Sequence, residues 1–433
     1  MMQKIHSVLF PTASISILAA LLIFHLPAVR PVVAFGSVFM FTSLLYLVMG
    51  WTLVKVEVRD VLLYSLIVLS LLVRLSFVGS NPIGSEDAFR YLWDGKVQSN
   101  GINPYLYTAL DEHLNVLRSP LLPAAMNHAD LKTIYFPLSQ WIFYICYQIS
   151  GEALWSYKVL YLFAEITTMA GLFLVLTKFS IPRKYLLLYA LCPLPIIEFA
   201  VDAHLDAIGL PLFIFALFFY LSERKVFSYV LLGLSMSIKP VGLILIPGFL
   251  FMEKGWRNKL TAVIVPLITV GVQFIPYFFT SNPFETLFAF TKDWSFNGIV
   301  FELFYRYFHD NQIARLYCAA ILGVVLVLLN FKRKDFLEAG YFSIIFLMLL
   351  SPVVHPWYVS WLAVLLPIVR KWSGIVLAAV VSLTSFTVMN FKLTGVWTQY
   401  PIVLAFEYIP VIVLLAIELR QRAVTRNEGK IRL

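Results

Sequence analysis

The feature that most constrains this chain is a series of long apolar runs, separated by short polar segments, that extends from residue 8 to residue 419. A helix needs about 20 apolar residues to cross a bilayer, and most runs approach that length. Hydrophobic residues make up 60% of the 433 residues and charged residues only 13%. These values exclude a soluble enzyme, a disordered chain and a small disulfide-built domain. Because unpaired backbone groups are costly in lipid, we expect an all-α, polytopic membrane protein.

The apolar runs predict about 12–14 transmembrane helices within a single integral membrane domain, 1–433. Three short runs, 226–238, 240–252 and 357–369, leave the count open by about two. The segment 136–150 is apolar but short, so we expect it to lie at the interface, within an outer loop over 80–155. The runs are 8–27, 32–54, 61–79, 156–177, 185–200, 206–222, 226–238, 240–252, 260–280, 313–330, 338–354, 357–369, 373–390 and 400–419.

The short basic clusters predict the orientation of the chain, because Lys and Arg are enriched in cytoplasmic loops. One threading places all of them on one side, together with both termini, and leaves 80–135, 281–312 and 391–400 on the outer face. We therefore expect the working site on the outer face, in a bacterial inner membrane. Clusters scattered between apolar runs do not indicate a nucleic-acid partner. The clusters are Lys55/Arg59, Lys178/Arg183/Lys184, Arg224/Lys225, Lys254/Arg257/Lys259, Lys332/Arg333/Lys334, Arg370/Lys371 and the tail residues Arg420, Arg422, Arg426, Lys430 and Arg432.

A polar stretch begins where the third predicted span leaves the membrane. Its residues Asp87, Arg90, Tyr91 and Asp94 are spaced i, i+3, i+4 and i+7, so on a helix they share one face. A carboxylate on that face could take a proton from a hydroxyl nucleophile. The segment 103–105, Asn-Pro-Tyr, predicts a rigid turn. The helical spacing of these four side chains is equally consistent with a solvent-exposed helix whose charges form local ion pairs.

Three further polar positions are candidates for binding an anionic or sugar ligand. Lys239 lies between two short apolar runs. A buried cation at such a position indicates a functional residue, whereas the alternative is that its side chain extends to the membrane interface. His204 lies between Asp202 and Asp206, and this spacing of two residues does not form a helical metal face. It could hydrogen-bond a sugar or lie in an exposed turn. His355 lies between two prolines and could contact a phosphate or lie near lipid headgroups.

The stretch 85–105, SEDAFRYLWDGKVQSNGINPY, resembles the first outer-loop motif of the GT-C superfamily of membrane glycosyltransferases. It is most similar to the polyprenyl-phosphate-mannose-dependent mannosyltransferases, whose pattern is D-x-x-R-Y-x-W-D-G-x-x-x-x-x-G-x-N-P-Y. The segment 134–140 resembles the tyrosine-proline-proline-leucine segment that follows, with Phe136 in place of the first proline. Weaker similarities are the acidic-histidine patch Glu198/Asp202/His204/Asp206, Lys239-Pro240 and the segment 355–358.

The resemblance implies transfer of a hexose, with mannose as the first choice, from a polyprenyl phosphate to a hydroxyl of a glycolipid or glycan. It implies inversion at the anomeric carbon, with Asp87 as the general base. It requires no cofactor, and a metal is possible but not expected, with Glu86 as a conceivable second ligand. The positions that it marks as substrate-binding are Glu86, Arg90, Tyr91, Asp94, Asn103, Tyr105, Tyr135, Gln140, His204, Asp206, Lys239, His355 and Tyr358.

Three other functions remain open on the residues alone. A transporter or flippase of lipid-linked sugars fits the composition equally well, but predicts charges within the spans and repeats in the two halves. A polymerase or ligase that moves a preassembled glycan would share the outer-face site. A non-catalytic scaffold would not need the dense polar motif at 85–105. We therefore expect a glycosyltransferase.

Overall fold

A computed structural model describes residues 2–332 and 335–425. These residues form helices joined by loops and contain no strand. The only β-type contacts among them are two isolated bridges, from Phe296 and from Asn297 to Val353. The all-α prediction is confirmed. The predicted basic residues at 333–334 and 426–432 lie outside the described residues.

The first half of the chain forms the helices that carry Asp87 and Asp206 and the turn that carries His204. Pro31 and Pro137 each stand at the start of a helix, where the missing N–H costs nothing. The elements are α1 (Met2–Leu21), α2 (Pro31–Leu53), α3 (Asp60–Ser76), α4 (Asp87–Ser99), α5 (Pro137–Ser150), α6 (Trp155–Lys178), α7 (Leu187–Ala190), α8 (Pro193–Pro195), the π-helix η4 (Ile196–Val201), α9 (Asp206–Leu221) and α10 (Lys225–Ile238).

The second half contains shorter helices, because prolines interrupt several apolar runs. Helix α10 ends at Ile238, since Pro240 restricts the backbone of the preceding residue, Lys239. The elements are η5 (Pro240–Leu245), α11 (Ile246–Met252), α12 (Trp256–Gly271), α13 (Ile275–Phe278), α14 (Glu285–Asp293), α15 (Ile299–Phe308), α16 (Asn311–Lys332), α17 (Phe336–Leu350), α18 (Pro356–Ala363), α19 (Leu366–Val369), α20 (Trp372–Val380), α21 (Ser385–Thr394) and α22 (Pro401–Thr425).

The protein is an integral membrane protein by the length and composition of its helices. Within the described residues, 7 helices are long and apolar enough to cross a membrane, or 8 if the bent pair Arg183–Ala190 and Pro193–Val201 forms one span. The prediction of about 12–14 spans counted apolar runs rather than unbroken helices. Several of those runs form only the shorter apolar helices Asp206–Leu221, Lys225–Ile238, Pro240–Met252 and Phe336–Leu350.

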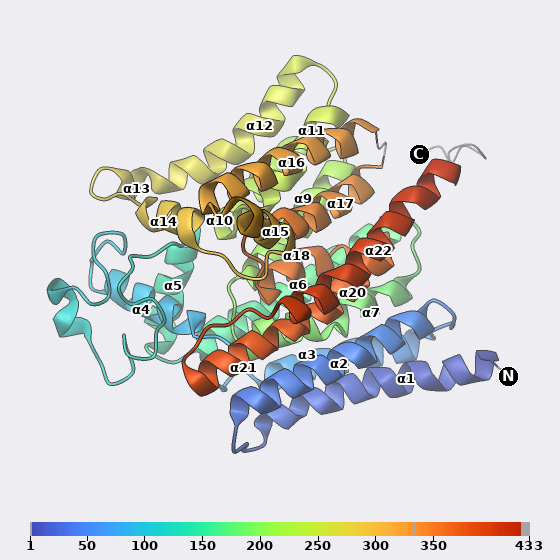
Figure 1. The fold of residues 1–433 in the computed structure, drawn as a ribbon, viewed down its shortest axis with the longest axis horizontal. Coiled ribbons are helices and arrows are strands. Elements are labelled where there is room, and N and C mark those ends of the chain that lie inside the picture. Colours follow the sequence, from blue (N-terminus) through green and yellow to red (C-terminus); the bar gives the residue numbers. More distant parts are fainter. Residues whose placement is uncertain (1, 333–334, 426–433) are drawn as a thin grey trace.

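The helices place the loop with α4 and α5 at one end of the molecule. In Figure 1 both termini lie at the right of the view, and α4 and α5 lie at the left. The connection between α2 and α3, which carries Lys55 and Arg59, lies at the same end as the termini. Helix α5 has 14 residues and packs against α4. It is too short to span a bilayer, and its position at the interface stays a prediction.

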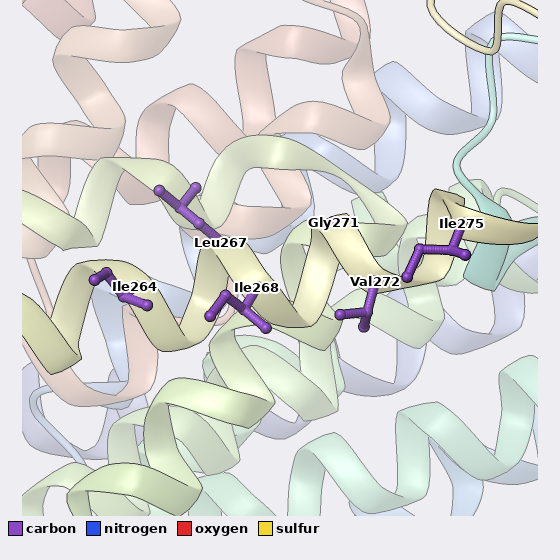
Figure 2. Close-up of a pocket in the computed structure, with 6 residues that line it drawn as sticks. All are labelled: Ile264, Leu267, Ile268, Gly271, Val272 and Ile275. Carbon is purple, nitrogen blue, oxygen red and sulfur yellow. The ribbon is translucent and has the colours of Figure 1, made fainter. Parts of the chain in front are cut away.

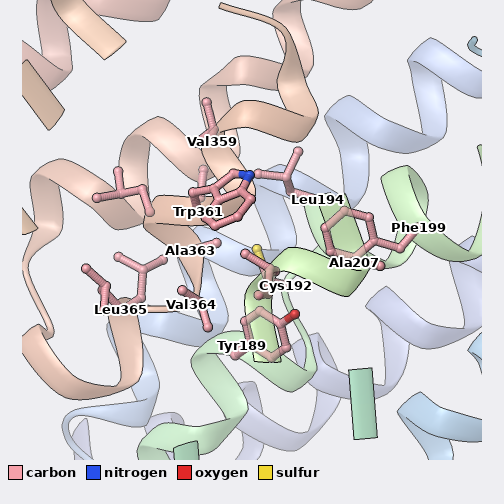
Figure 3. Packing of buried hydrophobic residues seen from close by; sticks show 14 of the residues in the cluster. Tyr189, Cys192, Leu194, Phe199, Ala207, Val359, Trp361, Ala363, Val364 and Leu365 are labelled. Carbon is pink, nitrogen blue, oxygen red and sulfur yellow. The ribbon is translucent and has the colours of Figure 1, made fainter. Parts of the chain in front are cut away.

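A continuous buried core holds the polar residues in place. Trp361 of α18 packs among Leu194, Phe199 and Ala207 of the segment around η4 (Figure 3). Its indole lies against Gly209 of α9, where any side chain would collide with it. The core therefore fixes α18 against the turn between η4 and α9, which carries the acidic-histidine patch.

Candidate active site

The carboxylate of Asp87 occupies the first position of α4, at the end of the molecule opposite the termini. Its Oδ1 accepts a hydrogen bond of 2.8 Å from Asn127 Nδ2. Its Oδ2 lies 4.0 Å from His204 Nε2, and 20% of the side chain is exposed. One oxygen is therefore fixed by the protein, while the other faces His204, and part of the side chain stays exposed.

His204 is completely buried beside this carboxylate. Its Nδ1 lies 3.0 Å from Glu198 Oε2 and 3.1 Å from the Glu198 carbonyl oxygen. Its Nε2 lies 3.1 Å from Ser85 Oγ. Glu198 belongs to the π-helix η4, and Ala203 adopts a positive φ of 59°, so the backbone of this turn is strained. π-Helical turns and such strain cluster at functional sites.

Trp357 lies between two histidine rings. Its ring centroid is 3.8 Å from that of His204 and 4.3 Å from that of His355, with interplanar angles of 19° and 6°. His355 also meets the rings of Phe296 and Tyr358. Burial lowers the pKa of His355 to about 3, and the charge of Lys239 acts in the same direction. The His355 ring is therefore neutral at physiological pH and can donate one N–H.

Lys239 supplies the positive charge of the cluster. Its Nζ lies 3.1 Å from Asp206 Oδ1 and 3.6 Å from the centre of the Tyr358 ring. Trp361 Nε1 donates to the same Asp206 oxygen at 2.7 Å. The predicted positions Lys239, Asp206, His355 and Tyr358 thus meet at one place, although they lie far apart in the sequence.

The loop before α4 is tied to the acidic-histidine turn. Asp202 Oδ1 accepts from the backbone N–H groups of Ile83 and Gly84 at 2.8 and 2.9 Å. A Cβ at Gly84 would lie 2.5 Å from Asp202 Oδ2, so this close approach requires glycine. Lys158 Nζ donates to the Val201 carbonyl and to Ser80 Oγ, both at 2.9 Å. These contacts set the distance between Asp87 and His204.

Arg90 and Asp94 share the helical face of Asp87, but they bind the loop before α5 and the first turn of α5. Arg90 Nη2 donates to the carbonyls of His128 and Leu131 at 2.9 and 2.7 Å. Asp94 Oδ2 accepts from Thr133 Oγ1 at 2.6 Å and from Gln140 Nε2 at 2.9 Å. Burial raises the pKa of Asp94. Both charges therefore hold the loop onto α4, one to two turns away from Asp87.

The remaining tyrosines and Asn103 connect this loop to the bundle. Tyr105 Oη donates to the Tyr135 carbonyl at 2.7 Å. Asn103 Nδ2 donates to Thr280 Oγ1 at 2.9 Å, and its Oδ1 accepts from Tyr105 N at 2.9 Å. The rings of Tyr91 and Tyr135 meet edge to face at 5.1 Å. The predicted turn at 103–105 is thus formed.

Glu86 lies next to Asp87 but points elsewhere. Its carboxylate forms an ion pair with Lys392 of α21. Within the described part of the chain, no group of three or more His, Cys, Asp or Glu side chains is arranged to hold a metal ion. The structure therefore does not bring Glu86 together with Asp87 as a pair of ligands.

Several residues of the cluster were not predicted individually. Asn127 lies in a turn without periodic pattern, so no signal in the sequence could identify it. Ser85 was part of the motif but was given no role. Trp357 and Trp361 are spaced i, i+4 on α18, and this spacing would have predicted that both face the same neighbour.

A hollow in the protein surface is lined by none of these residues. It is an open, apolar hollow of about 430 Å³ on the surface of α12 and α13 (Figure 2). It is lined by Ile264, Leu267, Ile268, Gly271, Val272 and Ile275. These side chains offer no group for acid–base chemistry, so this surface is not a second candidate for the reaction site.

An all-helical membrane protein that places a partly exposed carboxylate beside a cation and stacked aromatic rings fits the class of membrane glycosyltransferases. The family model described as alpha-(1->6)-mannopyranosyltransferase, N-terminal domain, matches residues 7–254. The model of the MptB C-terminal domain matches residues 302–420. The first match covers more than half of the chain, which therefore belongs to this mannosyltransferase family, in agreement with the resemblance to the GT-C superfamily. No curated protein and no solved structure matches the sequence.

Proposed function

We propose that this mannosyltransferase moves one mannosyl group from a polyprenyl-phosphate-mannose donor to the C6 hydroxyl of a mannose-containing glycolipid or glycan. Asp87 is the general base of this proposal. The observation that carries it is the position of the Asp87 carboxylate, whose side chain is partly exposed and whose Oδ2 lies 4.0 Å from His204 in the cluster that contains Lys239. The family description supplies the (1->6) linkage.

The geometry of Asp87 suits proton abstraction. Asn127 holds Oδ1, so Oδ2 keeps a fixed direction without further reorganisation. The residue opens α4, where the helix dipole favours a negative charge. As the acceptor oxygen attacks the anomeric carbon, Oδ2 takes its proton. Direct attack inverts the anomeric configuration, so an alpha-(1->6) product requires a β-linked mannosyl phosphate donor.

The leaving group is a lipid monophosphate, on which negative charge grows as the anomeric C–O bond breaks. Lys239 supplies a cation for this charge, and neutral His355 supplies an N–H donor. Asp206 and Trp361 fix the direction of Lys239. Since cationic and N–H donors serve the phosphate, the proposed reaction needs no metal ion.

The location of the cluster supports a lipid-linked donor. Helix α4, which Asp87 opens, lies at the end of the molecule opposite the termini, and in this proposal a lipid phosphate leaves the hydrocarbon region at that end. The basic loop between α2 and α3 lies at the terminal end. By the positive-inside rule this arrangement favours cytoplasmic termini and an active site on the outer face of a bacterial inner membrane.

The test supplies purified protein in lipid nanodiscs with synthetic β-mannosyl phosphoryl polyprenol and an α-mannoside acceptor. Matched controls are the acceptor that lacks the C6 hydroxyl and GDP-mannose as a soluble donor. We expect a new alpha-(1->6) linkage only with the lipid-linked donor and the complete acceptor. Transfer from GDP-mannose, or transfer to the 6-deoxy acceptor, would contradict the proposed donor or the proposed linkage, respectively.

A further inference from the structure

Glu198 and His204 form a buried pair that the proposed transfer does not yet use. The Glu198 and His204 side chains are only 3% and 1% exposed. Two acceptors, the carboxylate and the carbonyl of Glu198, converge on His204 Nδ1 at 3.0 and 3.1 Å. The Nδ1 atom therefore carries the proton of the neutral ring, and the lone pair of Nε2 is directed toward Ser85 and Asp87.

The stacking of Trp357 on His204 leaves the imidazole little freedom to rotate. The distance of 4.0 Å between Nε2 and Asp87 Oδ2 is longer than a hydrogen bond. A movement of about 1 Å would bring the two atoms within hydrogen-bond distance. Such a movement is ordinary, because catalytic hydrogen bonds are often long before substrate binds. Ser85 Oγ lies beside both groups, 3.1 Å from Nε2 and 3.2 Å from Asp87 N.

The surroundings of His204 favour a positive charge on its ring. Burial opposes that charge, but the hydrogen bond and the charge of Glu198, followed by those of Asp87 and Asp202, raise the pKa of His204. The positively charged groups near the pair are fewer than the acidic ones. The titratable and charged groups that face the pair are Asp87 of α4, Lys158 of α6, Glu198 of η4, Asp202 and Asp206 of the following turn, Lys239 after α10 and His355 before α18.

We propose that Glu198 is a positioning residue that holds His204 as the next acceptor of the proton taken by Asp87, an inference that rests on the proposed function. The C–O bond forms at the anomeric carbon, and the electron pair of the broken bond stays on the phosphate. Asp87 receives the hydroxyl proton and passes it to His204 Nε2. The resulting imidazolium is stabilised by Glu198 and loses its proton to water when the products leave. Asp87 is thereby ionised again for the next cycle.

The test compares pH profiles of transfer for the wild type, Glu198→Gln and His204→Gln in nanodiscs, with the synthetic donor and acceptor. In the wild type, kcat falls on the acid side as His204 becomes protonated, because the charged ring cannot accept a proton. In Glu198→Gln the negative charge that favours protonation of His204 is lost, so the acid limb moves to lower pH. The maximal kcat at higher pH falls about 10-fold. In His204→Gln this acid limb disappears, and kcat falls more than KM.

Glu253→Gln is the matched control, because Glu253 is equally buried and accepts from Tyr229 at 3.0 Å. We expect it to lower stability without moving the acid limb. Should Glu198→Gln fail to fold, His204→Ala is assayed with added imidazole, which the proposal expects to restore transfer most strongly above the pKa of imidazole.

The outcomes separate this inference from the proposed function. If Glu198→Gln and His204→Gln keep the acid limb of the wild type while Asp87→Asn is inactive, Asp87 is the base but the relay is wrong. Absence of imidazole rescue in a folded His204→Ala variant has the same meaning. If the wild type itself transfers no mannose from the lipid-linked donor, the proposed function is wrong.

Discussion

Two clusters of charged side chains in this protein differ in how much of their charged groups is exposed. Between α3 and α6, Arg74 Nε donates to Glu165 Oε2 at 2.6 Å, and Tyr189 donates to the same carboxylate. The Arg74 and Glu165 side chains are 1% and 2% exposed, and the hollow beside them is about 10 Å³, room for at most one water. In the cluster of Asp87, by contrast, both the carboxylate and Lys239 are 20% exposed.

The comparison shows that buried charge alone does not identify a reaction site in a membrane protein. In the Arg74 cluster both carboxylate oxygens are used by the protein, so the cluster joins helices. In the Asp87 cluster Asn127 donates to one oxygen, the other oxygen lies 4.0 Å from His204 Nε2, and part of the side chain is exposed. This difference predicts that substitutions in the Asp87 cluster lower activity, whereas substitutions in the Arg74 cluster lower stability.

The largest effect on activity is expected for Asp87→Asn. The amide keeps the shape of the side chain and a partner for Asn127, but it cannot take a proton. General-base catalysis contributes about 10²–10⁴-fold, so we expect transfer to fall by that factor with an unchanged melting temperature. Initial rates and thermal unfolding in the same nanodiscs measure both quantities. A variant with more than half of the wild-type rate would reject Asp87 as the base.

For Glu165→Gln we expect lower stability and unchanged activity, because this substitution leaves the buried Arg74 without its counter-charge. Breaking a buried ion pair costs about 3–5 kcal/mol, so the melting temperature should fall strongly. The kcat of the protein that remains folded should stay close to the wild-type value. An inactive Glu165→Gln variant of normal stability would remove the distinction between the two clusters.

The proposed contact between Lys239 and the donor phosphate is tested by Lys239→Met. Loss of a cation that stabilises a developing charge typically lowers the rate about 10²–10³-fold. Because this variant also leaves Asp206 unpaired, the double variant Lys239→Met/Asp206→Asn serves as its control. Both are expected to lose kcat/KM for the donor, whereas KM for the acceptor stays constant. An unchanged kcat/KM for the donor in the double variant would exclude the phosphate contact.

A smaller effect on activity is expected for Asp94→Asn, which sharpens the comparison within α4 itself. Asp94 accepts from Thr133 and Gln140 and is buried, so its contacts hold the segment after residue 128 onto α4. We expect less than about a 10-fold loss of kcat, with a clear drop in melting temperature, because a hydrogen bond to a charged group contributes about 1.5–3 kcal/mol. A loss of activity as large as that of Asp87→Asn, at normal stability, would place Asp94 in the reaction.

The smallest effect concerns the stability of the protein at acid pH. The pKa of His355 is lowered to about 3, against an ordinary value near 6.5. The unfolded chain therefore binds a proton that the folded protein refuses, and stability is lost as the pH falls from about 6.5 toward 3. In His355→Gln the melting temperature should decrease less between pH 6.5 and 5, by about 2–4 °C. Parallel curves for the two proteins would contradict this assignment.

The sequence correctly predicts the class of fold, whereas the roles of the candidate site residues stay predictions. Helical spacing correctly placed Asp87 and Asp94 on one face of α4. A helix rises about 1.5 Å per residue, so seven residues separate them by roughly 10 Å along the axis, and both cannot contact the same reacting atoms. Residues far apart in the sequence, such as Asn127 and Asp87, meet only through the fold, and no periodicity indicated their contact.

The number of spans shows a second limit of the sequence pattern. Hydropathy alone cannot distinguish one long helix from two short ones that meet at a break. Pro240 after Lys239 and Pro356 after His355 make such breaks, and both prolines adjoin residues of the site. The interruptions that reduce the count of long helices are therefore the same ones that expose polar groups inside the bundle.

The most direct test of the central claim is the anomeric configuration of the mannosyl product formed from the β-linked polyprenyl-phosphate donor. Nuclear magnetic resonance of the product distinguishes the α from the β linkage. The account predicts an α linkage from the β donor, by direct attack with Asp87 as the base. A β-linked product would show retention of configuration and would contradict single-step transfer with Asp87 as the general base.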